Sequence, residues 1–257
     1  MNYIGIDIGS TCAKTVVLNE KKEIIQEFVQ PTGWSSIDTA EEILQKLKLA
    51  GINLSDDSSC CVATGYGRIS VPYADKTVTE ITCHALGAVH LFQQPDLTVI
   101  DIGGQDTKII QIEQGFVKDF IMNDKCAAGT GRFLEVMANT LSLRPNEMFD
   151  LARLGSDTTI SSMCTVFAES EVIGLIGKGE PKENIAYAVV DSTIRKVAAQ
   201  VSRMNGEMST FCLTGGLCEC EYIREALSKK LGKEVISSPY ARYAGAIGAA
   251  LSAMKIR

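Results

Sequence analysis

The stretch DIGGQDTK at residues 101–108 repeats the pattern of DIGSTCAK at residues 7–14. Both stretches read Asp-Ile-Gly, then four residues, then Lys, and the two copies start 94 positions apart. Apolar runs flank each copy, so each is typical of a strand, a tight turn and a second strand. A duplicated unit of this kind predicts two related halves that face each other across a cleft.

Each turn carries groups that suit phosphate. Successive backbone N–H groups in a tight turn form a concavity for phosphate oxygens, and glycine allows a close approach that a Cβ would block. Ordinary β-hairpins are the alternative interpretation of a single copy, and two copies at matching positions favour the phosphate site. The candidate phosphate-binding residues are Gly9, Ser10, Thr11, Lys14, Gly103, Gly104, Thr107 and Lys108.

Two further features support a nucleotide site. Asp7 and Asp101 end strands at positions where a carboxylate can hold a hydrated Mg²⁺ ion. Gly215 and Gly216 follow an apolar strand and precede a helix, where they let the backbone approach a nucleoside. The small-residue stretch 244–250 predicts a wall of the nucleotide pocket or a tightly packed helix, and tight packing is the favoured interpretation.

Two of the nine cysteines stand out from the rest. Cys126 lies in a Gly-rich turn before a helix that is expected to begin near Thr130, and Cys164 directly precedes a second helix. A thiolate near a helix N-terminus is stabilised by unpaired N–H groups, and the same field suits an anionic iron–sulfur cluster. Two thiolates cannot complete a four-ligand site, whereas a homodimer would supply four.

The other cysteines and the two histidines are given structural roles. Cys60 and Cys61 lie in a buried-strand pattern, and a small side chain suffices for Cys12 inside the first turn. A second metal site is the minor alternative for the cysteines near the C-terminal Gly-Gly, which are Cys212, Cys218 and Cys220. His84 and His90 lie in a helix-like stretch and are assigned no role.

The overall composition excludes several classes of function. The net charge is −6 without a block of basic residues, which argues against nucleic acid or an anionic membrane as a partner. The N-terminal MNYIGIDIGS has no basic segment, and no apolar run approaches the roughly 18 residues of a membrane span. A cytoplasmic location with free or metal-bound thiols is therefore expected.

The hydrophobic pattern predicts alternating strands and helices in two subdomains, at residues 1–95 and 96–257. Strands are expected at residues 2–8, 14–19, 22–28, 60–64, 97–102, 107–112, 116–122 and 211–214. Helices are expected at residues 39–50, 130–141, 181–206, 221–231 and 244–254.

DIGST, DIGGQDTK and LTGG resemble the phosphate and adenosine motifs of the acetate and sugar kinase, chaperone ATPase and actin superfamily. This resemblance implies a duplicated actin-like (ribonuclease H-like) α/β ATPase fold, with two subdomains around a cleft that binds ATP and Mg²⁺. It also implies that Gln105 or Asp101 orients the attacking water and that Asp7 lies near the metal.

Longer motifs resemble the activators of 2-hydroxyacyl-CoA dehydratases and the ATPase subunits of benzoyl-CoA reductases. They are ATGYGR (63–68), TEITCHALGA (79–88), KCAAGTGRFLE (125–135) and CTVFAESEVIGLI (164–176). The resemblance implies a homodimer with one bridging 4Fe–4S cluster, ligated by Cys126 and Cys164 of each copy. It further implies an electron donor, ferredoxin or flavodoxin, and ATP-driven one-electron transfer to a dehydratase or related reductase. Cys220 departs from this family, which usually has Asn at that position.

Two rival functions remain open at this point. One is a small-molecule kinase of the sugar-kinase type, which would hold no cluster, so iron content after anaerobic purification separates it. The other is an ATP-dependent assembly or regulatory module, which would bind a partner without reducing it. The activator interpretation adds an expectation of its own: Cys126 follows Lys108 by 18 residues, with one strand between them, so ATP should change the exposure of the cluster.

Overall fold

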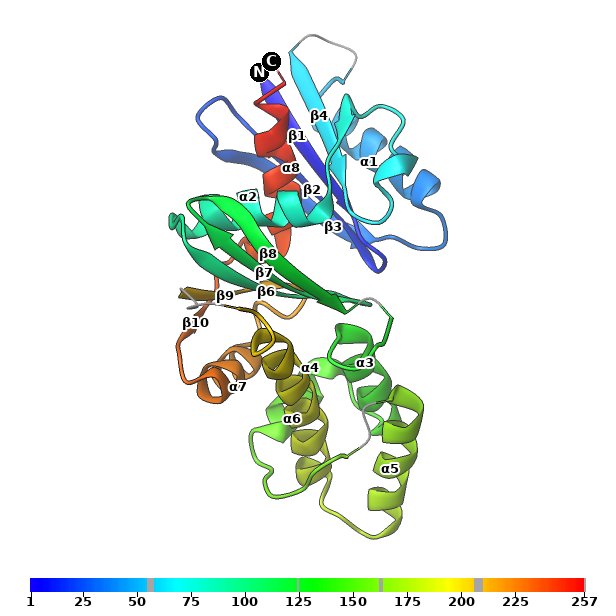
Figure 1. Cartoon of the computed structure of the whole chain (residues 1–257). Coiled ribbons are helices and arrows are strands. Elements are labelled where there is room, and N and C mark those ends of the chain that lie inside the picture. Colours follow the sequence, from blue (N-terminus) through cyan, green and yellow to red (C-terminus); the bar gives the residue numbers. More distant parts are fainter. Residues whose placement is uncertain (55–57, 124, 162–163, 206–209, 257) are drawn as a thin grey trace. The chain divides into compact units, whose positions relative to one another are not determined.

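Each repeated stretch joins the first two strands of a five-stranded sheet (Figure 1). The computed structural model describes residues 1–54, 58–123, 125–161, 164–205 and 210–256. The first sheet has the order β3-β2-β1-β4-β5, and the second, written from its other edge, has the order β8-β7-β6-β9-β10. Equivalent strands thus occupy equivalent places, which confirms the predicted duplication of an α/β fold.

The strands and helices agree closely with the predicted pattern. The strands are β1 (Asn2–Ile8), β2 (Cys12–Leu18), β3 (Ile24–Pro31), β4 (Ser59–Thr64), β5 (Lys76–Thr77), β6 (Leu97–Ile102), β7 (Thr107–Glu113), β8 (Phe116–Asn123), β9 (Thr210–Gly215) and β10 (Val235–Ile236). The helices are α1 (Ser36–Leu49), α2 (Glu80–Phe92), α3 (Gly131–Thr140), α4 (Pro145–Ala152), α5 (Thr165–Gly177), α6 (Lys182–Val201), α7 (Glu221–Leu231) and α8 (Ala244–Ala253).

Contacts between residues divide the chain into two units. The first comprises Met1–Leu97, Ile112–Lys118 and Ser238–Arg257, and the second comprises Thr98–Gln111 and Asp119–Ser237. The sequence predicted subdomains at 1–95 and 96–257, so the main difference is that the C-terminal helix α8 belongs with the first unit. The reason is the close packing of α8 on that unit, described below.

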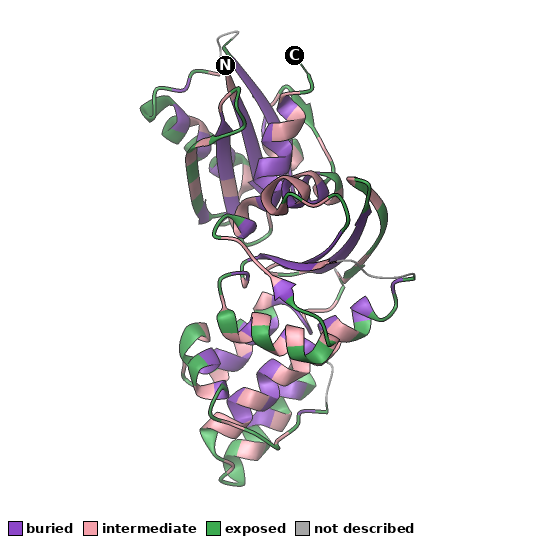
Figure 2. Ribbon diagram, turned by 90° about the vertical axis from the view of Figure 1, so that its left-hand side faces the viewer, coloured by how far each residue is buried: buried purple, intermediate pink, exposed green. Residues whose placement is uncertain are grey.

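The first sheet is covered on both faces, because successive side chains of a strand point to opposite sides. Ile6 and Ile8 of β1 share a buried cluster with Ile43 of α1. Tyr3, also from β1, belongs to a second cluster with Ala250 of α8. Burial on both faces explains why β1, β2 and β4 read as nearly continuous apolar runs, and Figure 2 shows these strands coloured as buried.

Helix α8 approaches its neighbours at backbone distance. A Cβ placed on Gly5 of β1 would lie 1.9 Å from the carbonyl oxygen of Ala246. A Cβ on Gly248 of α8 would lie 1.8 Å from the carbonyl oxygen of Cys83 in α2. Only glycine fits at such distances, so the small-residue helix is a packing element, as the sequence favoured.

The second unit carries α3 to α7. The long helix α6 begins after Pro181, as predicted, and buries Ile185, Val189 and Val197 against its neighbours α4 and α7. Helix α4 was not predicted, although Pro145 occupies its first turn and the backbone N–H of Arg144 donates to Glu147 at 2.7 Å. The sequence RPNE at 144–147 thus held a capping signal that the apolar pattern alone did not reveal.

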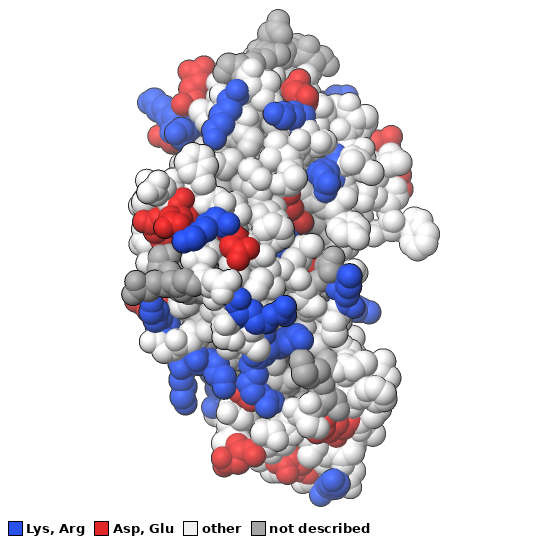
Figure 3. All heavy atoms as spheres, viewed as in Figure 1, with Lys and Arg blue, Asp and Glu red and all other residues white. Residues whose placement is uncertain are grey.

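Charged side chains gather around α7 on the face drawn in Figure 3. The last turn of this helix carries Lys229 and Lys230, which complement the negative end of the helix dipole. Arg153 pairs with Glu221 at 3.3 Å and with Glu225 at 2.8 Å on the same helix. Arg153 therefore has acidic partners on α7, while most of the charged side chains drawn around this helix in Figure 3 are Lys and Arg. Within the described ranges, no helix is both long and apolar enough to cross a membrane.

We expect Gly248→Ala to lower the free energy of unfolding by about 1–3 kcal/mol or more, because the added methyl group would overlap the backbone of α2. Chemical denaturation followed by circular dichroism measures this change. Ser252→Ala on the same helix is the control, since it adds no atom to the contact with α2. It removes the hydrogen bonds of the Ser252 hydroxyl to Gly248 and to Cys83, and it should change stability by about 1 kcal/mol at most. Equal stability of the two variants would contradict the packing assigned to α8.

Candidate functional site

The two repeated turns are closed by the same hydrogen bond. The N–H of Gly9 donates to the carbonyl of Cys12 at 3.1 Å, and the N–H of Gly103 donates to that of Asp106 at 2.9 Å. The tip residues are exposed or half-buried: Ser10 and Thr11 in the first turn, Gly104 and Gln105 in the second. Tips of this kind can present their N–H groups to an anion, as the sequence predicted.

Asp7 carries a buried carboxylate at the end of β1. Its Oδ2 lies 3.6 Å from Nζ of Lys14, and its side chain is 1% exposed. A Cβ on Gly65 would lie 2.4 Å from Oδ1, and a Cβ on Gly245 would lie 2.7 Å from Oδ2, so the two glycines leave room beside the carboxylate. Within the described part of the chain, Oδ1 has no hydrogen-bond partner. Such an oxygen can accept from a water of a hydrated cation.

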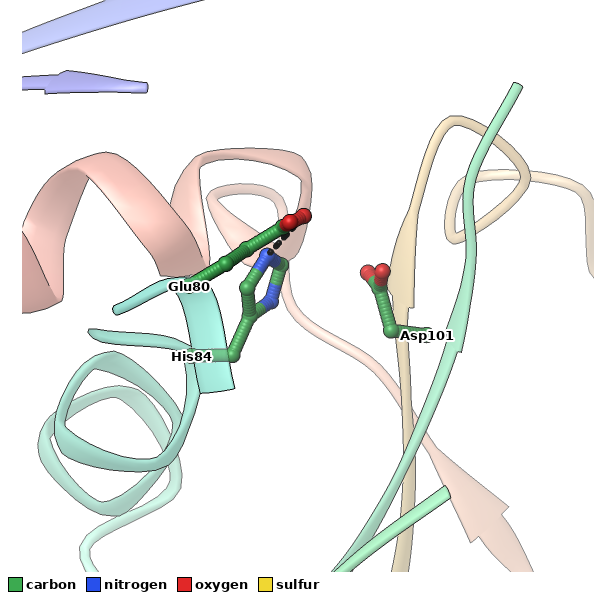
Figure 4. Close-up of side chains that lie close together, drawn as sticks. All are labelled: Glu80, His84 and Asp101. Carbon is green, nitrogen blue, oxygen red and sulfur yellow. Dashed lines mark ion pairs between the residues drawn. The ribbon is translucent and has the colours of Figure 1, made fainter. Parts of the chain in front are cut away.

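His84 lies near Asp7, although the sequence gave it no role. It is buried on α2, and its Nε2 lies 3.7 Å from Oε1 of Glu80 one turn earlier (Figure 4). The Cβ that Gly245 lacks would lie 3.0 Å from this same Nε2 and 2.7 Å from Oδ2 of Asp7. The missing side chain at Gly245 therefore lets the imidazole and the carboxylate share one region of the first unit.

Asp101, the counterpart of Asp7, is buried, and both of its carboxylate oxygens have a partner. Its Oδ1 accepts from the Thr214 hydroxyl at 2.8 Å, and its Oδ2 lies 3.4 Å from Nζ of Lys108. The same ammonium group lies 2.7 Å from Oδ2 of Asp106, and the Lys108 side chain is only 1% exposed. Lys108 thus ties the end of β6 to the last residue of the turn, which fixes the shape of the turn.

The C-terminal Gly-Gly motif meets the second turn at the ends of β6 and β9. Gly215 has a φ of +83°, in the left-handed region, and the N–H of Gly216 donates to the carbonyl of Ile102 at 3.2 Å. A Cβ on Gly215 would lie 2.4 Å from that carbonyl oxygen and 2.9 Å from Oδ1 of Asp101. The structure therefore brings the predicted nucleoside motif next to Asp101, and glycine is required there on both conformational and steric grounds.

The two candidate cluster cysteines are accessible. Cys164 is exposed and is the N-cap residue of α5, as predicted. Cys126 is half-buried in the loop before α3, which begins only at Gly131. The side-chain amide of Asn123 holds this loop by donating to the carbonyl of Cys126 at 2.8 Å and to that of Ala128 at 3.0 Å. Loop contacts, rather than a helix end, therefore position Cys126.

Segments next to the two cysteines line one hollow of about 250 Å³ in the second unit. Its lining residues are Ala128, Ile160, Ser161, Ser192, Arg195, Lys196 and Ala199. Arg195 of α6 donates to the carbonyl of Ile160 at 3.0 Å, so α6 supports the segment that leads to Cys164. Ala128 lies two residues from Cys126, and Ser161 lies three residues from Cys164. The fold thus gathers both cysteine segments against α6.

The other cysteines are buried, apart from Cys12 and Cys220, which are half-buried. Burial raises the pKa of the Cys61 and Cys212 thiols, and nearby carboxylates add to the rise. Burial likewise raises the pKa of Cys83 to about 12. Within the described residues, Cys212, Cys218 and Cys220 do not bring their sulfur atoms within 4.8 Å of one another. The geometry therefore gives no support to a second metal site at these cysteines.

A family model matches residues 4–253 of the chain, and it is the model of the BadF/BadG/BcrA/BcrD ATPase family. The chain belongs to this family. A relative in Acidaminococcus fermentans, the (R)-2-hydroxyglutaryl-CoA dehydratase activating ATPase, is 44% identical over 98% of this chain and 96% of its own length.

Solved structures agree with the family membership. The activator of 2-hydroxyisocaproyl-CoA dehydratase from Clostridium difficile, with bound ADPNP, has a TM-score of 0.90 and 34% identity, and the match covers 100% of this chain and 95% of that one. A ROK family glucokinase from Streptomyces griseus has a TM-score of 0.60 at 16% identity over 99% of this chain and 100% of that one, which shows the fold alone. The chain therefore has the duplicated actin-like ATPase fold that its sequence predicted.

Two side chains in the site of this family member had no predicted role. Thr214 and Asp106 lie within the recognised motifs, yet only the structure shows that Thr214 bonds Asp101 and that Asp106 pairs with Lys108. The sequence signal was their position beside the glycines. That signal identifies a turn but does not say which side chains face each other across it.

We expect Lys108→Met to lower the free energy of unfolding by about 3–5 kcal/mol, because it leaves the carboxylates of Asp101 and Asp106 without their buried cation. Urea denaturation at neutral pH measures the change. Lys118→Met is the matched control: Lys118 pairs with Glu113 at 2.7 Å, but both side chains are about half exposed, so the loss should be about 1 kcal/mol at most. A Lys108 variant as stable as the control would contradict the central role of this ion pair.

Proposed function

We propose that this protein is an ATP-hydrolysing iron–sulfur activator that drives one-electron transfer into a 2-hydroxyacyl-CoA dehydratase or a related CoA-ester reductase. The observation that carries the proposal is the arrangement of the second unit. Its phosphate turn, its nucleoside motif and the segments of both accessible cysteines belong to one unit, and residues beside the two cysteines line one hollow. The relatives in Acidaminococcus fermentans and Clostridium difficile, which match over nearly their full length and are named as dehydratase activators, support the same conclusion.

The nucleotide is proposed to bind through the two turns. The backbone N–H groups of Gly9, Ser10 and Thr11 would face phosphate oxygens, as would those of Gly103 and Gly104. Gly215 and Gly216 would lie against the nucleoside. Two of the remaining predicted binding residues, Lys14 and Lys108, would act mainly by holding the turns, because both lie near buried carboxylates. The side chain of the third, Thr107, is buried and donates to Gly129, so Thr107 would meet the phosphate through its backbone.

The residues present fit a hydrated Mg²⁺ ion. Asp7 has a buried carboxylate oxygen without a protein partner, which is the kind of acceptor that a metal-bound water needs. Gln105 is exposed at the tip of the second turn, so it is free to orient an attacking water, while Asp101 would fix the strand end behind it. When bound, Mg²⁺ neutralises charge on the phosphates and holds them in place.

The donor set also fits a 4Fe–4S cluster. Cys126 is half-buried and Cys164 is exposed on neighbouring segments of the second unit, and each chain would supply these two ligands. When bound, such a cluster stores one electron for transfer. The proposed donor of that electron is reduced ferredoxin or flavodoxin, and the proposed acceptor is the partner dehydratase or reductase.

The surface that follows Cys164 supports a homodimer around the shared cluster. Helix α5 leaves large apolar side chains in solvent: Val166 and Phe167 are each 67% exposed and Ile173 is 56% exposed. Apolar groups exposed on one helix are typical of an interface. Since the helix starts at Cys164, two copies packed along it would bring four thiolates together.

ATP can drive this transfer only if its binding free energy differs between two conformations of the protein. In the proposed cycle the ATP-bound form exposes the cysteine segments to the partner, and hydrolysis returns the protein to the form that accepts an electron.

We expect anaerobically reconstituted protein to hold about four irons per two chains, because each copy donates two thiolates. Cys126→Ser and Cys164→Ser should each lose the iron, whereas Cys60→Ser should keep it, since Cys60 is buried inside β4. Iron analysis and the absorbance of the cluster measure this. Full iron content in Cys126→Ser or in Cys164→Ser would contradict the assignment of that cysteine as a cluster ligand.

We expect Gly103→Val to abolish ATP hydrolysis without unfolding the chain, because a Cβ there would lie 2.4 Å from Oδ1 of Asp106 in the turn. Phosphate release measures hydrolysis, and circular dichroism checks the fold. In the wild-type protein, reduction of the partner should require hydrolysable ATP and should fail with ADPNP. Wild-type turnover in the folded Val variant, or reduction of the partner without ATP, would refute the proposed function.

A further inference from the structure

Three hydrogen bonds join the second phosphate turn to the segment that follows Cys126: one reaches the loop of Cys126 and two reach the start of α3. The hydroxyl of Thr107 donates to the carbonyl of Gly129 at 2.7 Å. The N–H of Gly131 donates to the carbonyl of Gly103 at 2.9 Å, and the N–H of Arg132 donates to that of Gly104 at 2.8 Å. The turn and the loop are therefore in contact, although a whole strand separates them in the sequence.

The Thr107 hydroxyl is not needed to form the turn itself. The first copy has Ala13 at the equivalent position, also buried, and its turn closes with the same backbone hydrogen bond. Thr107 is fully buried on β7, and its hydroxyl is directed away from its own turn, to Gly129. The first copy lacks this hydroxyl, and the second copy uses it to bond the cysteine loop. We therefore assign the Thr107 hydroxyl to the connection between the turn and the loop.

Gly129 is held firmly at its place in the loop. Its φ is +86°, and a Cβ there would lie 2.8 Å from Cγ of Lys196 on α6, so neither the conformation nor the space admits a side chain. The N–H of Thr130 donates to the carbonyl of Ala127 at 3.0 Å, which closes the loop around Gly129. A displacement of the Gly129 carbonyl therefore moves this loop as a whole.

The loop carries Cys126 with it. Gly129 lies three positions after Cys126, a span of at most about 11 Å even when extended. The side-chain amide of Asn123 donates to the carbonyls of both Cys126 and Ala128, which limits the flexibility of this span. A shift of the phosphate turn can thus be passed to Cys126 through the hydrogen bond to Gly129 and the short loop between them.

We propose that Thr107 is the positioning residue that transmits the nucleotide state from the second phosphate turn to Cys126. The proposal rests on the proposed function of the two sites. Nucleotide at the turn shifts the start of β7, and the Thr107 hydroxyl carries that shift to Gly129 and so to the cysteine loop. Without the hydroxyl, only the two backbone hydrogen bonds from the start of α3 connect the turn to this segment, and the response of the loop to the nucleotide weakens.

The first measurement is hydrogen exchange of residues 125–131 in cluster-free full-length protein, at saturating ADP or saturating ADPNP. The wild type should show different exchange rates in the two nucleotides. In Thr107→Val this difference should shrink by about two- to tenfold, the range that one neutral hydrogen bond supports. Thr107→Ser keeps the hydroxyl and should restore most of the difference, which a merely structural role of the side chain would not predict.

Thr15→Val is the matched control. Thr15 is also a buried strand threonine, but within the described residues its hydroxyl has no hydrogen-bond partner, so its loss should change nothing. If Thr107→Val does not fold, Thr107→Ala takes its place, because alanine is what the first copy already carries there. An exchange difference as large in the folded Thr107 variant as in the wild type, or no difference in the wild type, would overturn the coupling.

The second measurement uses protein reconstituted with its cluster and follows iron removal by a coloured chelator. Removal should be faster with ADPNP than with ADP in the wild type and in Thr15→Val, and the ratio of the two rates should fall about two- to tenfold in Thr107→Val. A wild-type protein that binds no iron would refute the proposed function. The exchange measurement would still decide the coupling, because it needs no cluster.

Discussion

One buried ammonium group organises the second unit. Nζ of Lys108 lies 3.4 Å from Oδ2 of Asp101 and 2.7 Å from Oδ2 of Asp106, so a single charge joins the end of one strand to the end of the turn that follows it. Removing a charge from water is unfavourable unless partners surround it. The turn that is proposed to bind phosphate depends on this pairing, and so does the bond between Asp101 and Thr214.

The two copies of the motif have diverged around this common plan. In the first copy Lys14 is 19% exposed and 3.6 Å from Asp7, so the pair is looser than its counterpart. Asp7 keeps a carboxylate oxygen without a protein partner, whereas both oxygens of Asp101 are engaged. The difference suits a division of labour in which the first carboxylate meets a hydrated ion and the second supports the fold.

The second copy also connects the turn to the cysteine loop. Gly103 and Gly104 accept hydrogen bonds from the start of α3, and Thr107 donates to Gly129. A strand between the turn and Cys126 was the expected route of coupling, but the hydrogen bonds provide a shorter one. Since a hydrogen bond is lost over a fraction of an ångström, such a link responds to small shifts of the turn. In the proposed homodimer, the exposed apolar side chains of α5, which follow Cys164, would form the contact with the second copy.

The sequence by itself determined the duplication, the positions of most strands and helices, and the motifs, because these depend on local periodicity and on where glycine is required. The short edge strands β5 and β10 were not predicted. The sequence also singled out Cys126 and Cys164 from the other cysteines. Tertiary structure decided which side chains meet. Thr214 reaches Asp101 across 113 positions, and Thr107 reaches Gly129 across 22, so no local pattern could pair them. Tertiary structure also decided that α8 belongs with the first unit. The sequence shows only that α8 is rich in small residues, whereas the neighbours that Gly5 and Gly248 contact at backbone distance are visible only in the folded chain.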